Sequence, residues 1–91
     1  MKLVKVEWVD SFGVGASWQP TSDASDEKHV CISVGYLAKN GKNVKVIVPH
    51  LSPANENIGA EEQGCGDMAI PVSSIVSMVD LIEDPSYAME V

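Results

Sequence analysis

Aromatic, hydroxyl and ammonium side chains recur along the chain in a pattern that could bind a small anionic ligand. Trp18 follows the glycine-bearing stretch 10–17, and an aromatic ring on such a loop can stack on a nucleobase or pack back over the end of the domain. Serine hydroxyls and loop amides can hold a phosphate or a ribose, and lysines can supply positive charge. The predicted ligand-binding residues are Ser11, Phe12, Trp18, Ser33, Tyr36, Lys39, Lys42 and Ser73.

Four side chains, His29, Cys31, His50 and Cys65, give the right number of soft ligands for a structural zinc site. Their spacing matches no zinc-finger pattern, and two cysteines cannot build a disulfide framework. We interpret Cys31 as a buried thiol, His29 as the exposed end of a strand and Cys65 as part of an exposed turn. The sequence therefore predicts no metal and no cofactor.

Nucleophilic catalysis needs a thiol or hydroxyl with an orienting partner, and the best pair in this sequence is Cys65 with Asp67. The sequence has no nucleophile elbow, paired-carboxylate spacing or catalytic metal motif. The stretch Gly13-Val14-Gly15 is like a fragment of a phosphate loop, but no Gly-Lys-Ser/Thr element follows it, so we interpret it as a hinge and turn. We therefore expect no catalytic residues and no enzymatic activity.

The charge distribution limits the classes of partner. The 91-residue chain has six lysines, no arginine and 13 acidic residues, for a net charge of −7. This composition disfavours duplex nucleic acid, because phosphate binding depends on basic charge and on bidentate arginine contacts. Residues 46–91 contain no lysine, and their acidity indicates either a solvated surface or a face that binds a protein. A small basic patch near a hairpin would consist of Lys28, Lys39, Lys42 and Lys45.

The hydropathy of the chain predicts a soluble protein. No apolar run approaches the ~18 residues of a membrane span, and the first residues read as a strand rather than as a signal peptide. We expect a cytoplasmic protein without a membrane partner. The length is that of one small domain, which we place at residues 1–84, with a C-terminal tail at 85–91.

Alternating apolar residues predict strands in the first half of the chain. Residues 2–9 place Val4, Val6 and Trp8 on one face, with Trp8 in the core, and the long segment 10–28 is a loop. Residues 29–38 form a second strand, in which Gly35 marks a bend, a bulge or a close approach of another backbone. The Asn-Gly pair at 40–41 predicts a hairpin to a third strand over 43–50. In the second strand, one face holds Val30, Ile32, Val34 and Tyr36, and the other holds His29, Cys31, Ser33 and Gly35.

The second half of the chain predicts two further strands. Residues 51–66 read as a loop, 67–70 as a short strand and 72–74 as a 3₁₀ turn after Pro71. Residues 75–83 suit a strand better than a helix, because they are short and rich in β-branched residues. These elements predict an all-β fold, a small five-stranded SH3-like or Sm-like barrel with a long first loop and one 3₁₀ turn before the last strand. The alternative is an α+β domain with a helix over 73–82.

Three stretches resemble a group of small bacteriophage-encoded proteins of uncharacterised function. They are Val6-Glu7-Trp8-Val9-Asp10-Ser11 with the loop to Trp18, Cys31-Ile32-Ser33-Val34-Gly35-Tyr36-Leu37, and Ile70-Pro71-Val72-Ser73-Ser74-Ile75-Val76. The similarity covers most of residues 4–82, but Gly15-Ala16-Ser17-Trp18 departs from the adjacent glycines that such proteins often have before this tryptophan. The resemblance implies a phage protein in the host cytoplasm and, by analogy, a sponge that sequesters nucleotide-like immune signals between protomers.

Three functions are therefore open. The first is a non-enzymatic homo-oligomer that captures a small nucleotide-like molecule in anti-defence, with apolar interface candidates at Phe12, Val14, Tyr87, Met89 and Val91. The second is a protein-interaction module that binds a host or phage protein through acidic residues, namely Glu56, Glu61, Glu62, Asp67 and the acids of the tail. The third is a structural component of a virion.

Overall fold

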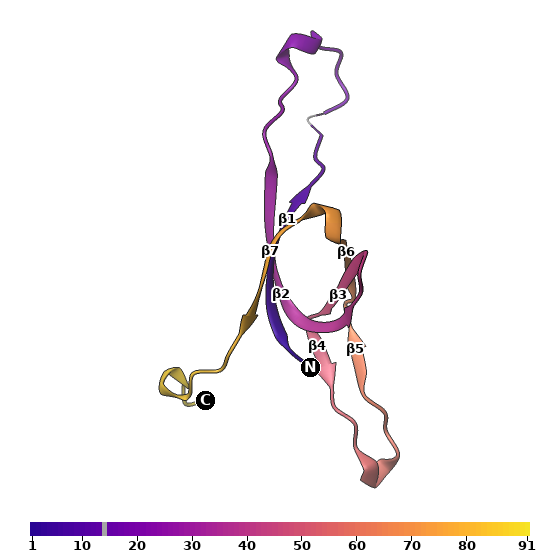
Figure 1. The fold of residues 1–91 in the computed structure, drawn as a ribbon, viewed down its shortest axis with the longest axis vertical. Helices are drawn as coiled ribbons and strands as arrows, with labels where there is room; N and C mark the ends of the chain where they lie inside the picture. The colour runs from indigo at the N-terminus through magenta and orange to yellow at the C-terminus, as the bar shows by residue number, and fades with distance from the viewer. Residues whose placement is uncertain (14) are drawn as a thin grey trace.

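A curved antiparallel sheet of five strands lies at the centre of the computed structural model, which describes residues 1–13 and 15–91 (Figure 1). Its strands are, in spatial order, β6 (Met68–Pro71), β3 (Val44–Val48), β2 (His29–Asn40), β1 (Leu3–Asp10) and β7 (Ile75–Leu81). A second sheet pairs β4 (His50–Ser52) with β5 (Gln63–Cys65). The described residues contain four 3₁₀ turns, η1 (Thr21–Asp23), η2 (Glu56–Ile58), η3 (Val72–Ser74) and η4 (Pro85–Tyr87), and no α-helix.

The predicted alternation in β1 is confirmed, because one face of the strand is buried. Val4 and Val6 point to the inner face of the sheet and are fully buried, and Trp8 packs beside them. Because the sheet is curved, Ile47 on β3 and Ile70 on β6 also face inward and pack with these residues in one core. Because β1 pairs with both β2 and β7, its inner side chains are surrounded by neighbouring strands.

The β2–β3 hairpin confirms the prediction made from Asn40-Gly41, although β3 is shorter than expected. Gly35 on β2 marks a close approach, because an added Cβ would lie 3.0 Å from the backbone oxygen of Val48 and 3.3 Å from Cβ of Ile47. A register shift between Leu37 and Lys39 adds a bulge, and β2 bends strongly at this point in Figure 1.

The segment that follows Pro71 confirms the predicted 3₁₀ turn at Val72–Ser74 and the predicted final strand. The turn is held in place by a hydrogen bond from the amide of Val72 to the carbonyl of Asn43, at 2.8 Å. Residues 75–81 pair with β1, so the alternative of a helix over 73–82 is wrong. β-Branched side chains and an available partner strand decide this in favour of the sheet.

The prediction of a closed five-stranded barrel is wrong in strand number and in closure. Among the described residues there are seven strands, and no backbone pairing joins the edge strands β6 and β7 into a ring. Apart from His50, the hairpin β4–β5 lies within the segment 51–66 that was predicted to be a loop. Each of its strands has three residues, most of them polar, so there is no apolar alternation to signal a strand.

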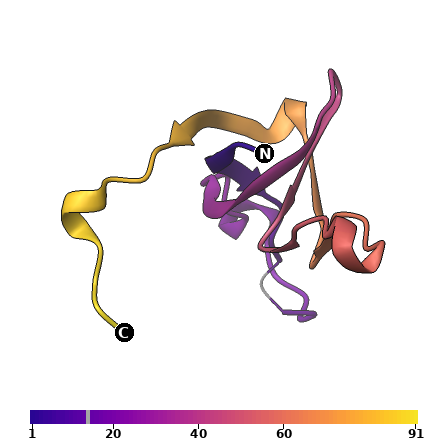
Figure 2. The same cartoon turned by 90° about the horizontal axis from the view of Figure 1, so that it is seen from below.

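Three arms project from the sheet: residues 11–28, the β4–β5 hairpin with its loop (residues 50–67), and the C-terminal segment 82–91 (Figures 1 and 2). The Cα radius of gyration is 18.3 Å, whereas a compact chain of this length would have about 12 Å. Every described residue of the first arm and of the C-terminal segment is exposed. A single copy therefore places about half of its length outside the packed core.

Candidate functional site

The first arm carries three of the predicted ligand-binding residues, Ser11, Phe12 and Trp18. Trp18 is fully exposed, at 103% of its reference area, so the interpretation that it packs back over the end of the domain is wrong. Phe12 lies against His29, with ring centroids 5.3 Å apart, while remaining half exposed. The amide of Ser11 donates to the carboxylate of Asp10 at 2.9 Å. The arm thus presents a free indole surface, with no described protein group covering it.

Ser33 lies on the inner face of β2, where its hydroxyl is already engaged. It accepts a hydrogen bond from Nε1 of Trp8 at 3.0 Å and donates to Sδ of Met68 at 3.9 Å. Cys31 is the next inner residue and is partly buried, close to the expectation of a buried thiol. The role that the structure shows for Ser33 is to satisfy the indole N–H beside the core.

The remaining predicted residues lie at separate places. Tyr36 is partly buried and lines a hollow of about 450 Å³ at one end of β1, β2 and β7. Lys39 lines another hollow, of about 290 Å³, together with Glu62 and Asp67. Lys42 is exposed in the hairpin turn, and Ser73 is exposed in η3. One copy therefore brings no more than one predicted ligand-binding residue into each described hollow.

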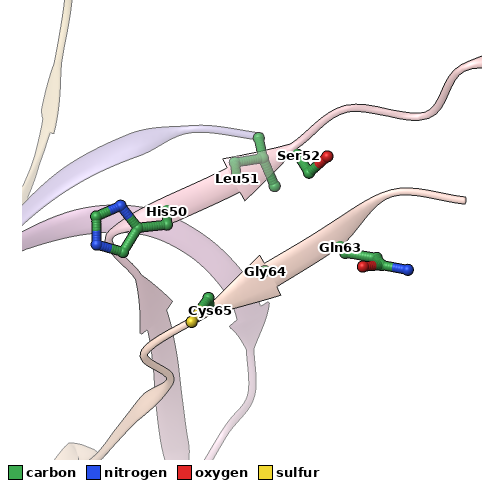
Figure 3. Close-up of a pocket in the computed structure, with 6 residues that line it drawn as sticks. All are labelled: His50, Leu51, Ser52, Gln63, Gly64 and Cys65. Atoms are coloured by element: carbon green, nitrogen blue, oxygen red, sulfur yellow. The ribbon is translucent and has the colours of Figure 1, made fainter.

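A hollow of about 220 Å³ lies on the β4–β5 hairpin (Figure 3). It contains His50 and Cys65, which are cross-strand partners and whose side chains both lie in the solvent-exposed hairpin. Two such ligands are fewer than a structural metal needs, and the described residues contain no cluster of three or more potential ligands. The lining residues are His50, Leu51, Ser52, Gln63, Gly64 and Cys65.

The predicted basic patch is not assembled as a free surface. Nζ of Lys45 donates to Oδ1 of Asn40 at 2.6 Å across the β2–β3 hairpin, and Lys28 lies in the first arm, distant in sequence from the turn. The two ion pairs among the described residues join Lys2 to Asp80 at 3.1 Å and Lys5 to Glu7 at 3.8 Å. Both pairs lie on the β1–β7 side of the sheet.

The surface that the sequence analysis missed is the outer face of the sheet, opposite the core. On β2 the inner positions are Cys31, Ser33 and Gly35, and the more apolar set points outward. Val30, Ile32 and Val34 are exposed at 50%, 64% and 51%. The strand register adds residues of β1 and β7, so that the outer face includes Lys5, Glu7, Val30, Ile32, Val34, Val79 and Leu81.

The sequence feature that could have revealed this face is the alternation in β2, which places Val30, Ile32 and Val34 on one side of the strand. Alternation alone does not say which side is covered by other strands. The register places Val6 opposite Ser33 on the inner side, and Lys5 opposite Val34 on the outer side. A solvated sheet face ordinarily carries polar residues, so a row of three exposed β-branched side chains makes this face unusually apolar.

The C-terminal arm contains a turn in which hydrogen bonds perturb the titration of Asp84. The carboxylate of Asp84 accepts hydrogen bonds from the hydroxyl of Ser86 at 2.6 Å and from its amide at 3.0 Å. These bonds lower the pKa of Asp84 below its ordinary value of 3.8. The same contacts cap η4 and give the exposed arm a defined turn.

Of the predicted apolar interface residues, Phe12, Tyr87, Met89 and Val91 are exposed, and Val14 lies outside the described residues. None of the helices in the described part of the chain is long and apolar enough to cross a membrane.

No family model matches this chain, and no curated protein and no solved structure matches it either. These comparisons therefore assign no function to the chain.

Proposed function

We propose that this protein is a non-enzymatic binding protein that works as an assembly of several copies. The observation that supports this most directly is the amount of apolar surface on its projecting arms. Ile58, Ile82 and Tyr87 are exposed at 75%, 90% and 81%, although burying such a side chain contributes about 1.5–3 kcal/mol. Small chains with little core commonly gain the missing stability from other subunits.

Sedimentation velocity of the full chain over a range of concentrations tests this proposal. We expect the mass to rise with concentration from 9.7 kDa to two or more copies, because association follows mass action. A single species of one copy at every concentration would contradict the oligomeric part of the proposal. Removal of residues 85–91 is a useful companion variant, because these residues lie outside the sheet.

The ligand that we propose is a small nucleotide-like anion held between copies. The free indole of Trp18 supports this, because stacking of a base on an aromatic ring contributes about 1–3 kcal/mol. The described hollows of one copy each contain at most one predicted ligand-binding residue, which favours a binding site shared between copies. The resemblance to phage proteins suggests the same class of ligand and an anti-defence role.

A panel of cyclic dinucleotides and cyclic ADP-ribose isomers tests the ligand class. A ligand present at about 100 times its dissociation constant adds about 2.7 kcal/mol of stability, which a thermal shift detects. Trp18→Ala is the matched variant and should lose the shift while keeping the melting temperature of the free protein, since this indole has no described neighbours covering it. The absence of a shift and of retained ligand across the panel would contradict this function.

A protein partner for the acidic arm is the second candidate. The hairpin arm projects from the sheet and carries Glu56, Glu61, Glu62 and Asp67 without any lysine. A projecting acidic arm of this kind suits a basic protein surface. Pull-down from host lysate at rising salt concentration tests it, and we expect capture to weaken as the salt concentration rises. Capture that is independent of salt would remove this reasoning.

A further inference from the structure

We infer that the outer face of the sheet is the surface through which two copies of this chain associate, packed face to face and related by a two-fold axis. This inference rests on the oligomeric state proposed above and names the surface responsible. It places the partner's Glu7 opposite Lys5, and the partner's Lys5 opposite Glu7. The two β1 strands then run antiparallel across the interface.

The β2 strand carries a row of apolar side chains on the outer face. Val30, Ile32 and Val34 occupy three successive outward positions and are half to two-thirds exposed. Val79 and Leu81 on β7 extend the apolar surface across the face, at 45% and 37% exposure. Packed sheets bury such alternating positions against each other at a spacing of about 10 Å. A partner that is itself a sheet therefore fits this surface.

The charges of the outer face are complementary to those of the same face on a second copy. Lys5 and Glu7 lie on the central strand, with Nζ and Oε1 3.8 Å apart and both side chains partly exposed. A two-fold axis that crosses β1 at the level of Val6 places position 5 of each copy opposite position 7 of the other. Each lysine then meets a carboxylate, whereas a parallel arrangement would place lysine against lysine.

The same symmetry also matches the apolar residues. Ile32 is paired in register with Glu7, and Val34 is paired with Lys5. The axis that exchanges positions 5 and 7 therefore places Ile32 opposite the partner's Val34 and excludes water from both. One lysine and one glutamate leave the central strand of the face without net charge, so it offers no electrostatic preference for a strongly acidic or basic protein. A second copy is the partner whose charge order it complements.

The size of the face sets the expected affinity. Three strands about 4.8 Å apart and about seven residues long, at about 3.3 Å per residue, cover roughly 300 Å². This is the size of the functional patches found on single-copy proteins, but it is smaller than the ~800 Å² per partner of a standard stable interface. We therefore expect a dimer that dissociates on dilution, with the arms adding contact area in the full assembly.

A charge-exchange experiment on the full chain tests the face directly. Lys5→Glu gives a face with two carboxylates, and Glu7→Lys gives a face with two ammonium groups. By sedimentation, each variant alone should dimerise at least tenfold more weakly than the unaltered chain. An equimolar mixture of the two should form a heterodimer, and the double variant K5E/E7K should dimerise again. A role of the Lys5–Glu7 pair within one copy cannot produce the heterodimer.

Lys42→Glu serves as the control, because it makes the same charge change in the exposed hairpin turn, away from the face. It should leave association unchanged. Ile32→Ser provides a variant without a charge change and should also weaken dimerisation at least tenfold, with an unchanged circular dichroism spectrum. Failure of the mixture to form a heterodimer, or association of I32S equal to that of the unaltered chain, would overturn the inference while leaving an oligomer formed elsewhere. If the unaltered chain stays a single copy throughout, the proposed function fails as well.

Discussion

Replacement of Gly35 by alanine tests the packing that bends β2 over β3. The added Cβ would lie 3.0 Å from the carbonyl oxygen of Val48, 3.3 Å from its carbonyl carbon, and 3.3 Å from Cβ of Ile47. Two of these three atoms belong to the backbone, and the third is fixed to it, so a change of rotamer cannot relieve the contact. The hairpin strands must instead separate by a few tenths of an ångström, next to the buried Ile47.

Two opposing effects decide the sign of the change in the free energy of unfolding. Alanine restricts the unfolded chain more than glycine does, which stabilises a protein by about 0.4–1 kcal/mol where the native site accepts it. Overpacking a filled site costs about 1–3 kcal/mol. The steric term is larger, so we expect a net destabilisation of about 1–2 kcal/mol. In a domain of this size each kcal/mol corresponds to about 4–8 °C in melting temperature.

The assay is thermal and urea unfolding followed by far-ultraviolet circular dichroism, with all variants at one protein concentration because association shifts the midpoint. Gly13→Ala is the matched control. No described heavy atom beyond its chain neighbours lies within 4 Å of a Cβ at Gly13, and its φ is outside the left-handed region. We expect this control to stay within about 0.5 kcal/mol of the unaltered protein. Equal stability of Gly35→Ala and Gly13→Ala would refute the close approach as the cause of the bend.

Four further substitutions separate structural from exposed groups. Ser33→Ala should cost about 1–2 kcal/mol in urea unfolding, because it leaves the partly buried Nε1–H of Trp8 without its acceptor; an unchanged midpoint would show that water replaces the hydroxyl. Trp8→Ala should cost about 3 kcal/mol in the same assay, whereas Trp18→Ala should change stability by less than about 0.5 kcal/mol; similar losses for both would contradict the exposure of Trp18. The carboxyl of Asp84 should titrate by NMR with a pKa below its usual 3.8, and Ser86→Ala should raise that pKa. Because the folded-state pKa is lowered, any support that the carboxylate gives to η4 is present at neutral pH and is lost as the pH falls through that pKa.

The local elements of the fold could be predicted because their signals are local. Alternation along 2–9 and 29–38, the Asn40-Gly41 pair, and proline before the 3₁₀ turn at 72–74 each act through neighbouring residues. Gly35 was predicted to mark a bend, a bulge or a close approach, and the structure shows a close approach to the backbone of Val48. The final strand over 75–81 followed from its β-branched residues.

The sites could be predicted only in part, for reasons of geometry. Ser33 was predicted to bind a ligand, but its hydroxyl accepts a hydrogen bond from Trp8, which only the β1–β2 register brings to it. The exposure of Trp18 depends on the direction in which the first arm leaves the sheet. Convergence of Tyr36, Lys39 and Lys42 on one ligand required a shared site, but Tyr36 and Lys39 line different hollows and Lys42 lies in the hairpin turn.

The sequence by itself determined the five strands of the main sheet, the β2–β3 hairpin and the 3₁₀ turn after Pro71, because these depend on period and on turn residues within a few positions. Only the tertiary structure decided which face of β2 is covered. The covered face is the one that bears Gly35 and Ser33, because the sheet curves toward the side where the smallest residues let strands approach. Val30, Ile32 and Val34 are left facing outward by that curvature, although hydrophobicity alone would place them inside.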